Sequence, residues 1–353
     1  MDFGTAPFIV DAIRKRCECE VLGYTGKPDS YYRAIINWVK QRYDLDVTKE
    51  MINFVPGIVP GIGMAMNSFT RPGDKVMIQP PVYHPFAWVT TRNERTLVTN
   101  PLKWGNGMYR MDLDAFREQV KGCKLFILCN PHNPGGVVWT EDELRTVAEI
   151  CYEEKVLVFS DEIHADLTLP PYKHRPFATI SEKAKMNSVT FMSPSKAFNM
   201  PGLAASHAII FNEDLRARFR KFMDAGELDM GHVFAFLSVE AAYTHGTEWL
   251  DQCLAYIQGN IDYVDNFLKT HAPRIKAIRP QASYLVWLDC RELGLNQEAL
   301  NDFFADKAHL ALNDGAMFGK EGTGYMRLNV ASPRSVIEQA MKQLAEAYQA
   351  MSF

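Results

Sequence analysis

Beyond about residue 50, short apolar runs alternate with segments whose apolar residues recur at helical spacing. The predicted strands are the apolar runs 51–55, 75–79, 124–129, 156–160 and 189–192. Runs that are apolar on both faces and separated by helices are typical of a mostly parallel sheet covered on both sides. We therefore expect an α/β fold with such a sheet in this part of the chain.

Two of the predicted helices carry start signals. Thr140 precedes the acidic run 141–143 and an amphipathic pattern to about residue 154, so a capping residue and an acidic first turn open this helix. Asp29 and Ser30 can cap a helix that runs to about residue 43.

The pattern changes after about residue 245, where a long helical stretch begins. The elements predicted there are a helix over 247–270, strands over 275–279, 283–289 and 325–330, a helix over 296–307 and a final helix from about 333. This order predicts a smaller α+β domain. We assign residues 22–245 to a large domain, and residues 1–21 with 246–353 to a small domain.

Composition narrows the class of protein. The 353 residues carry a formal net charge of −4, so no basic field is available to bind nucleic acid. The chain has neither a signal-peptide pattern nor an apolar stretch of about 18 residues. The seven cysteines are scattered, without the paired spacing of a zinc site. We expect a cytoplasmic protein that binds no metal and has neither nucleic acid nor a membrane as its partner.

Polar or glycine-rich segments follow four of the predicted strands. Ligands bind outside the carboxyl ends of strands in open α/β sheets, which directs attention to residues 57–61, 130–136, 160–164 and 193–196. The last segment ends in Lys196, and lysines are rarely held at a sheet's mouth without a charged or covalent partner. Taken alone, however, residues 193–196 favour the interpretation of Lys196 as an exposed loop lysine.

The interpretation of Lys196 changes when two other features are considered with it. Asp161 ends another predicted strand, and an Asn-Pro-His-Asn-Pro-Gly turn covers residues 130–135. In this order and at this spacing, the residues resemble fold type I enzymes of the aspartate aminotransferase superfamily, which use pyridoxal 5′-phosphate (PLP). The resemblance extends over nearly the whole chain. The MalY/PatB-type cystathionine β-lyases are the subfamily that it resembles most sharply, through the runs 23–25, 30–35, 56–60, 130–135, 161–164 and 194–199.

The resemblance implies PLP as the cofactor and gives three residues roles around its ring. Lys196 would hold the cofactor through its amino group and then remove the substrate α-proton. Asp161 would pair with the pyridinium nitrogen, and Asn133 would bind the cofactor O3′ and contact the substrate. A helix N-cap remains the alternative for Asp161, and a simple Asn-Pro turn remains the alternative for Asn133.

The phosphate of the cofactor is expected at the start of the helix that follows Gly57. Free backbone N–H groups of Ile58 and Val59 would bind it there, where the helix dipole also favours an anion. The resemblance implies that the Ser193 hydroxyl adds a further donor. The alternative is that residues 57–61 form a loop interrupted by glycines, which would account for the glycines without a phosphate.

Three further residues around the cofactor are implied by the resemblance. Tyr83 would stack on the pyridine face and act near the substrate, and an ordinary packed tyrosine remains the alternative. Tyr24 would reach the phosphate of a neighbouring subunit, which implies a homodimer with shared active sites. An aromatic residue of a surface loop remains the alternative for Tyr24. His164 stands where aspartate aminotransferases usually have tyrosine, and Ala204 stands where they have a phosphate-binding arginine. Both differences favour the lyase subfamily.

Arg327 interrupts the apolar strand over 325–330, where a guanidinium is costly unless it binds an anion. The α-carboxylate of an amino-acid substrate, held by two parallel hydrogen bonds, is the anion that we expect. A structural salt bridge with a nearby acid is the alternative.

The predicted reaction is α,β-elimination of L-cystathionine or a related L-cysteine S-conjugate, which gives a thiol, pyruvate and ammonia. A PLP-dependent aminotransferase, a regulatory protein that binds a partner through this fold, and a PLP-binding protein without turnover remain alternatives. Members of the subfamily usually begin some tens of residues before their Met-Asp-Phe run, so we expect an N-terminal segment to be missing before residues 1–3.

Overall fold

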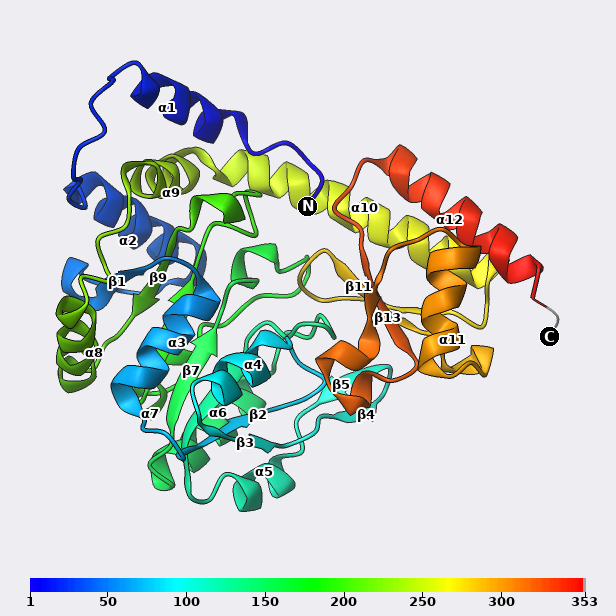
Figure 1. The fold of residues 1–353 in the computed structure, drawn as a ribbon, viewed down its shortest axis with the longest axis horizontal. Helices are drawn as coiled ribbons and strands as arrows, with labels where there is room; N and C mark the ends of the chain where they lie inside the picture. The colour runs from blue at the N-terminus through cyan, green and yellow to red at the C-terminus, as the bar shows by residue number, and fades with distance from the viewer. Residues whose placement is uncertain (352–353) are drawn as a thin grey trace.

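The chain is organised around a seven-stranded sheet with helices on both of its faces (Figure 1). This computed structural model describes residues 1–351. In spatial order, the strands are β1 (Ile52–Val55), β9 (Ser206–Ile209), β8 (Ser188–Met192), β7 (Leu157–Asp161), β6 (Cys123–Cys129), β2 (Lys75–Ile78) and β3 (Thr96–Thr99). Strand β9 runs antiparallel to both of its neighbours, whereas the pairings from β8 to β3 are parallel. The prediction of a mostly parallel sheet is confirmed.

The central strands are apolar throughout because both of their faces are buried. Along β6, Leu125 and Ile127 enter one hydrophobic cluster, while Phe126 and Leu128 enter another. The first cluster is covered by α3 (Ile58–Phe69), α4 (Pro85–Arg92) and α8 (Glu213–Ala225), and the second by α5 (Leu113–Gln119) and α6 (Glu141–Glu153).

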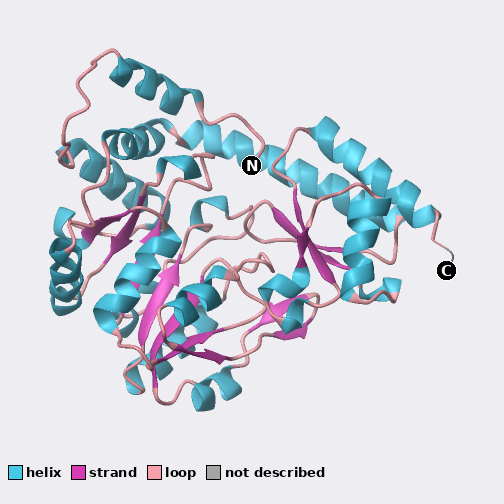
Figure 2. Cartoon of the chain, viewed as in Figure 1, coloured by secondary structure: helices cyan, strands magenta, loops and turns pink. Residues whose placement is uncertain are grey.

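A second sheet occupies the C-terminal part of the chain, as predicted (Figure 2). Its antiparallel strands are β10 (Lys276–Ile278), β11 (Leu285–Asp289), β13 (Tyr325–Asn329) and β12 (Asn313–Asp314). The helix expected over 296–307 is instead α11 (Gln297–Asp302) followed by a wider π-helical turn, in which Phe303 and Phe304 are both buried. The domain boundaries at 22 and 245 stay predictions.

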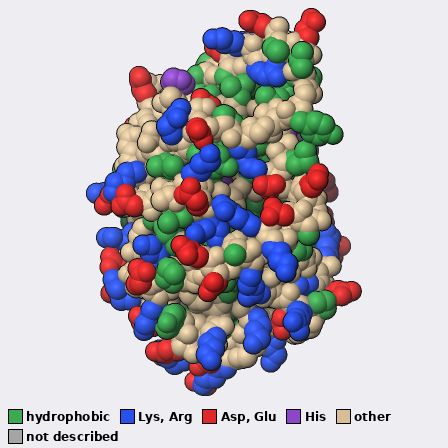
Figure 3. All heavy atoms as spheres, turned by 90° about the vertical axis from the view of Figure 1, so that its left-hand side faces the viewer, with side chains coloured by type: hydrophobic (Ala, Val, Ile, Leu, Met, Phe, Trp, Pro, Cys, Tyr) green, Lys and Arg blue, Asp and Glu red, His purple; other side chains and the backbone are tan. Residues whose placement is uncertain are grey.

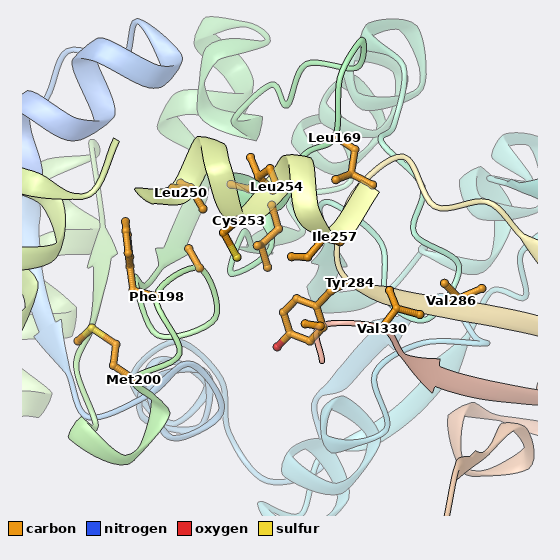
Figure 4. Packing of buried hydrophobic residues seen from close by; sticks show 14 of the residues in the cluster. Leu169, Phe198, Met200, Leu250, Cys253, Leu254, Ile257, Tyr284, Val286 and Val330 are labelled. Atoms are coloured by element: carbon orange, nitrogen blue, oxygen red, sulfur yellow. The ribbon is translucent and has the colours of Figure 1, made fainter. Parts of the chain in front are cut away.

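The long helix α10 (Thr247–His271) connects the two sheets through the largest hydrophobic cluster. Figure 4 shows its buried residues between the loop after β8 and the second sheet, among them Leu250, Cys253, Ile257, Phe198, Tyr284 and Val330. Phe198 follows Lys196 by two residues and is fully buried, so the core anchors the loop that presents this lysine.

The remaining elements complete the molecule. They are α1 (Pro7–Cys17), α2 (Asp29–Tyr43), α7 (Glu182–Met186), α9 (Val233–His245), α12 (Arg334–Gln349) and the hairpin strands β4 (Lys103–Gly105) and β5 (Met108–Arg110). Within residues 1–351, no helix combines the length and the apolar character needed to span a bilayer.

The start signals of the two helices have different outcomes. Thr140 and Glu143 form the expected reciprocal capping box at the start of α6. The capping role predicted for Asp29 and Ser30 is wrong, because α2 begins at Asp29 without a side-chain cap. Both side chains bind elsewhere in the fold: Asp29 pairs with Lys49, and the Ser30 hydroxyl donates to Glu240 at 2.8 Å.

Candidate active site

A cavity of about 500 Å³ opens at the carboxyl ends of the parallel strands. Segments that follow β1, β6, β7 and β8 meet there, and β13 closes it from the second sheet. The predicted site residues that line it are Ile58, Val59, Tyr83, Asn133, Asp161, His164, Lys196 and Arg327. Residues that lie up to 269 positions apart in the chain, from Ile58 to Arg327, therefore share one cavity.

Asp161 is the last residue of β7, and only 3% of it is exposed. One carboxylate oxygen accepts the backbone N–H of Ile163 at 3.1 Å. Burial raises the pKa of Asp161 to about 7, although Lys196 acts in the opposite direction. The short helix that follows begins at Ala165 without a side-chain cap, so the alternative role of a helix N-cap is not supported. A buried carboxylate of this kind is well suited to stabilise a cationic ring nitrogen.

Lys196 lies in the loop after β8 and is half-buried against the cavity. Burial lowers its pKa, the nearby Arg327 lowers it further, and Asp161 partly offsets both effects. A lowered pKa increases the fraction of uncharged amine, which is the form that attacks a carbonyl carbon and accepts a proton. The alternative of an ordinary exposed loop lysine is wrong.

The Arg327 guanidinium is held by two amide side chains. It donates to Asn133 Oδ1 at 2.9 Å and to Asn313 Oδ1 at 2.7 Å, while its Nε is buried without a partner. Burial lowers the pKa of Arg327 to about 10, and the groups that oppose this shift are the hydroxyls of Tyr83 and Tyr284 rather than carboxylates. The alternative of a structural salt bridge is therefore wrong, and a cation at neutral pH faces the cavity.

This contact also orients the amide of Asn133. A guanidinium can only donate, so the Asn133 oxygen must face Arg327 and the amide N–H₂ is left for another acceptor. The residue lies in the turn after β6 and is 5% exposed. A hydrogen bond from this N–H₂ to a ring oxygen of a cofactor is consistent with that orientation.

The anion-binding end of the cavity is formed by the start of α3. Gly57 precedes the helix with a φ of 150°, and the Gly61 N–H donates to the Gly57 carbonyl at 2.9 Å. The N–H groups of Ile58 and Val59 lie in the first turn, where a helix has no internal acceptors for them. Together with the dipole of the helix, they favour a phosphate.

The phosphate-donor role of Ser193 stays a prediction. Its hydroxyl lies 2.8 Å from the carbonyl oxygen of Ala205 and 2.8 Å from the hydroxyl of Ser195. Ser193 does not line the cavity, whereas Ser195 does.

Tyr83, His164 and Tyr24 lie in different surroundings. Tyr83 is half-buried and packs edge-on against Phe86, with ring centroids 5.7 Å apart. Burial lowers the pKa of His164 to about 3, so its ring is neutral. Tyr24 is 98% exposed, precedes α2 and lies outside this cavity, so the fold leaves it free to contact another molecule.

Several other residues of the cavity could not be predicted from the sequence. Asn313 belongs to β12, whose pairing with β13 sets it opposite Arg327. Tyr284 was expected only as part of a strand, yet it lines the cavity together with His84 and Cys129. The only signal in the sequence for His84 was its position next to the predicted site residue Tyr83.

Comparison with known proteins agrees with this geometry. The family model for aminotransferase class I and II matches residues 2–344. This chain belongs to that family. It is 38% identical to cystathionine beta-lyase PatB from Bacillus subtilis over 98% of this chain and 90% of PatB, and 30% identical to protein MalY from Escherichia coli over 99% of this chain and 90% of MalY.

The chain is also similar to a solved structure of cystalysin from Treponema denticola, which contains pyridoxal 5′-phosphate. It superposes with a TM-score of 0.97 at 34% identity, over 100% of this chain and 90% of cystalysin. The residues of the cavity fit that cofactor chemically. They offer an amine for its aldehyde, a carboxylate for its ring nitrogen, an amide donor for its ring oxygen and a helix start for its phosphate.

Proposed function

We propose that this chain is a PLP-dependent carbon-sulfur lyase that cleaves L-cystathionine or related L-cysteine S-conjugates by α,β-elimination. The products are a thiol, pyruvate and ammonia. The observation that carries the proposal is the convergence of Lys196, Asp161 and Arg327 on one cavity, in a chain similar over nearly its whole length to cystathionine β-lyases.

The residues divide the chemistry among them. PLP supplies an electron sink for the pair left when the substrate Cα–H bond breaks. The Asp161 carboxylate keeps the ring nitrogen protonated, and the Arg327 guanidinium binds the substrate α-carboxylate through two N–H groups. Lys196 holds the cofactor and removes the α-proton at its Nζ. The C–S bond then breaks with its electron pair going to sulfur, which takes up a proton to become the thiol. Water hydrolyses the remaining three-carbon imine to pyruvate and ammonia.

The test measures pyruvate and free thiol from L-cystathionine in the absence of any keto acid. Both products are expected in equal amounts from the wild-type protein, and Lys196→Ala should release neither. Turnover that requires an added keto acid would identify an aminotransferase instead. A PLP absorbance band near about 420 nm without turnover would indicate a binding protein that has lost catalysis.

We also propose a homodimer with shared active sites. Three exposed apolar side chains lie together before α2, with exposed fractions of 72% for Val21, 67% for Leu22 and 98% for Tyr24. Contiguous exposed apolar groups of this kind mark interaction sites. On the face that carries α1, α2 and α8, acidic and basic side chains are interspersed, and hydrophobic side chains gather toward the upper part (Figure 3). A second copy of this chain would cover Val21, Leu22 and Tyr24.

The cytoplasm is the proposed location. All seven cysteines are free thiols, and five of them are buried. Such usage suits a reducing compartment.

A further inference from the structure

A second cavity of about 410 Å³ lies beside the active site, and His84 lines both. It lies between the end of β2, helix α4 and the segment 316–321. Its walls are mostly apolar, formed by Ile78, Val82, Ala87, Trp88, Leu97 and Phe318. This cavity has no part in the chemistry described above.

Phe318 connects the second cavity to the substrate-binding arginine. The Arg327 guanidinium carbon lies 4.5 Å from the centroid of the Phe318 ring, and that ring lies 5.7 Å from His84. The backbone is fixed as well, since the Val82 N–H donates to the Phe318 carbonyl at 2.9 Å. The second cavity therefore begins one aromatic ring away from the group that would bind the α-carboxylate. His84, which lines both cavities, lies at their boundary.

The charges of the two cavities differ. Asp161 is the only carboxylate among the described residues that line the active-site cavity, and it is reserved for the cofactor, so that cavity offers nothing to a second ammonium group. The second cavity carries Lys320 and Glu321. Across residues 1–351, neither side chain takes part in an ion pair, and their short turn is held by the Gly322 N–H, which donates to the Gly319 carbonyl at 2.9 Å. Two charged residues of opposite sign, both outside any ion pair among the described residues, thus line this mostly apolar cavity.

We propose that the second cavity binds the leaving half of a zwitterionic S-conjugate such as L-cystathionine. Lys320 binds the distal carboxylate, Glu321 binds the distal ammonium group, and the apolar walls contact the methylene groups next to sulfur. His84 lies at the junction, beside the sulfur. This inference rests on the proposed lyase function and names the class of leaving group that the site selects.

The experiment compares two substrates that differ only at the distal end. L-Cystathionine carries the distal zwitterion, whereas S-propyl-L-cysteine has the same chain without it. In Lys320→Gln and in Glu321→Gln, KM for L-cystathionine should rise about threefold to fivefold, the scale of one exposed ion pair. KM for S-propyl-L-cysteine should not change. Lys342→Gln, on an exposed lysine of α12, is the matched control and should leave both values unchanged.

A variant of an apolar lining residue separates the contribution of apolar contact from that of charge. Trp88→Ala removes apolar surface and should raise KM for both substrates. Equal effects of the two charge variants on both substrates, or no effect on either, would overturn the inference. A wild-type protein that releases pyruvate from S-propyl-L-cysteine but not from L-cystathionine would overturn it while sparing the lyase function. Release from neither substrate would overturn both.

Discussion

Two charged residues of the active site, Asp161 and Arg327, have no counter-charge within residues 1–351 in hydrogen-bond contact. Asp161 is buried without a cation in hydrogen-bond contact, and Arg327 is held by two amides that cannot neutralise it. Burying a charge without a counter-charge costs free energy, and a ligand that brings the counter-charge returns part of that cost on binding. The residues most unfavourable to the free fold are the ones expected to bind cofactor and substrate most strongly.

Arg327→Lys should weaken substrate binding. A lysine ammonium cannot keep the hydrogen bonds to Asn133 and Asn313 and also present two parallel N–H groups to a carboxylate. We expect KM to rise roughly 10-fold to 100-fold, with a smaller change in kcat. Steady-state kinetics with L-cystathionine would measure this. The control is Arg291→Lys, which alters an arginine paired with Asp289 outside the cavity, and an equal effect of both variants would contradict the assignment.

Asp161 should make the stability of the cofactor-free protein depend on pH. Its pKa is raised by burial from the ordinary 3.8 to about 7, so between these values the folded protein binds a proton that the unfolded chain has lost. The free energy of unfolding therefore falls as pH rises through this window, by up to about 4 kcal/mol for this residue. Asp161→Asn removes the titration, so the variant should gain stability relative to wild type as pH rises from about 5 to about 7.5.

Urea denaturation of both cofactor-free proteins at the two pH values would measure the difference. A variant that instead loses stability relative to wild type at the higher pH would show that Asp161 is ionised and well paired in the free protein.

At the scale of elements, the position of α3 depends on its close approach to β1. A Cβ placed on Gly61 would lie 2.8 Å from a methyl carbon of Val55, a buried β-branched residue of β1 that has little freedom to move. Any residue larger than glycine must therefore push the start of α3 away from the sheet. The N–H groups of Ile58 and Val59 would move with it.

Gly61→Ala should accordingly destabilise the protein by about 1–3 kcal/mol, even though alanine is the better helix former. PLP affinity should fall as well, because the phosphate end of the cavity shifts. Gly259→Ala is the matched control within α10, where the nearest atom to the added Cβ is an Arg334 nitrogen at 3.4 Å. We expect that variant to be neutral or slightly stabilised. Thermal unfolding and PLP titration would measure both, and equal behaviour of the two variants would contradict the packing argument.

At the scale of the whole molecule, shared active sites make a prediction about mixed dimers. Tyr24→Ala and Lys196→Ala should each have little activity alone. If Tyr24 serves the neighbouring subunit, a hybrid dimer contains one site with both residues intact, and mixing should restore roughly a quarter of the wild-type activity. Pyruvate release after the two variants are unfolded and refolded together would measure it. A double variant, Tyr24→Ala with Lys196→Ala, mixed with Lys196→Ala should restore nothing.

The fold class, the sheet and the central site residues could be predicted from the sequence because their signals are local. Apolar runs such as 124–129 specify strands that are buried on both faces, and the polar residues that follow them meet because parallel strands end at one edge. This rule and the family resemblance were sufficient to predict the positions of Asn133, Asp161 and Lys196 at the cavity.

Only the tertiary structure decided which partners these residues have. Arg327 was expected to bind either a substrate carboxylate or a structural acid. In the fold its side-chain partners are two amide oxygens, that of Asn313, opposite it in the pairing of β12 with β13, and that of Asn133 in the turn after β6, so no acid among the described residues neutralises it. The hydroxyl of Ser193 turned out to be bound to the Ala205 carbonyl. The cavity beside His84 depends on where the segment 316–321 lies against α4. Such contacts join residues far apart in the chain, and no local pattern of apolar and polar positions encodes them.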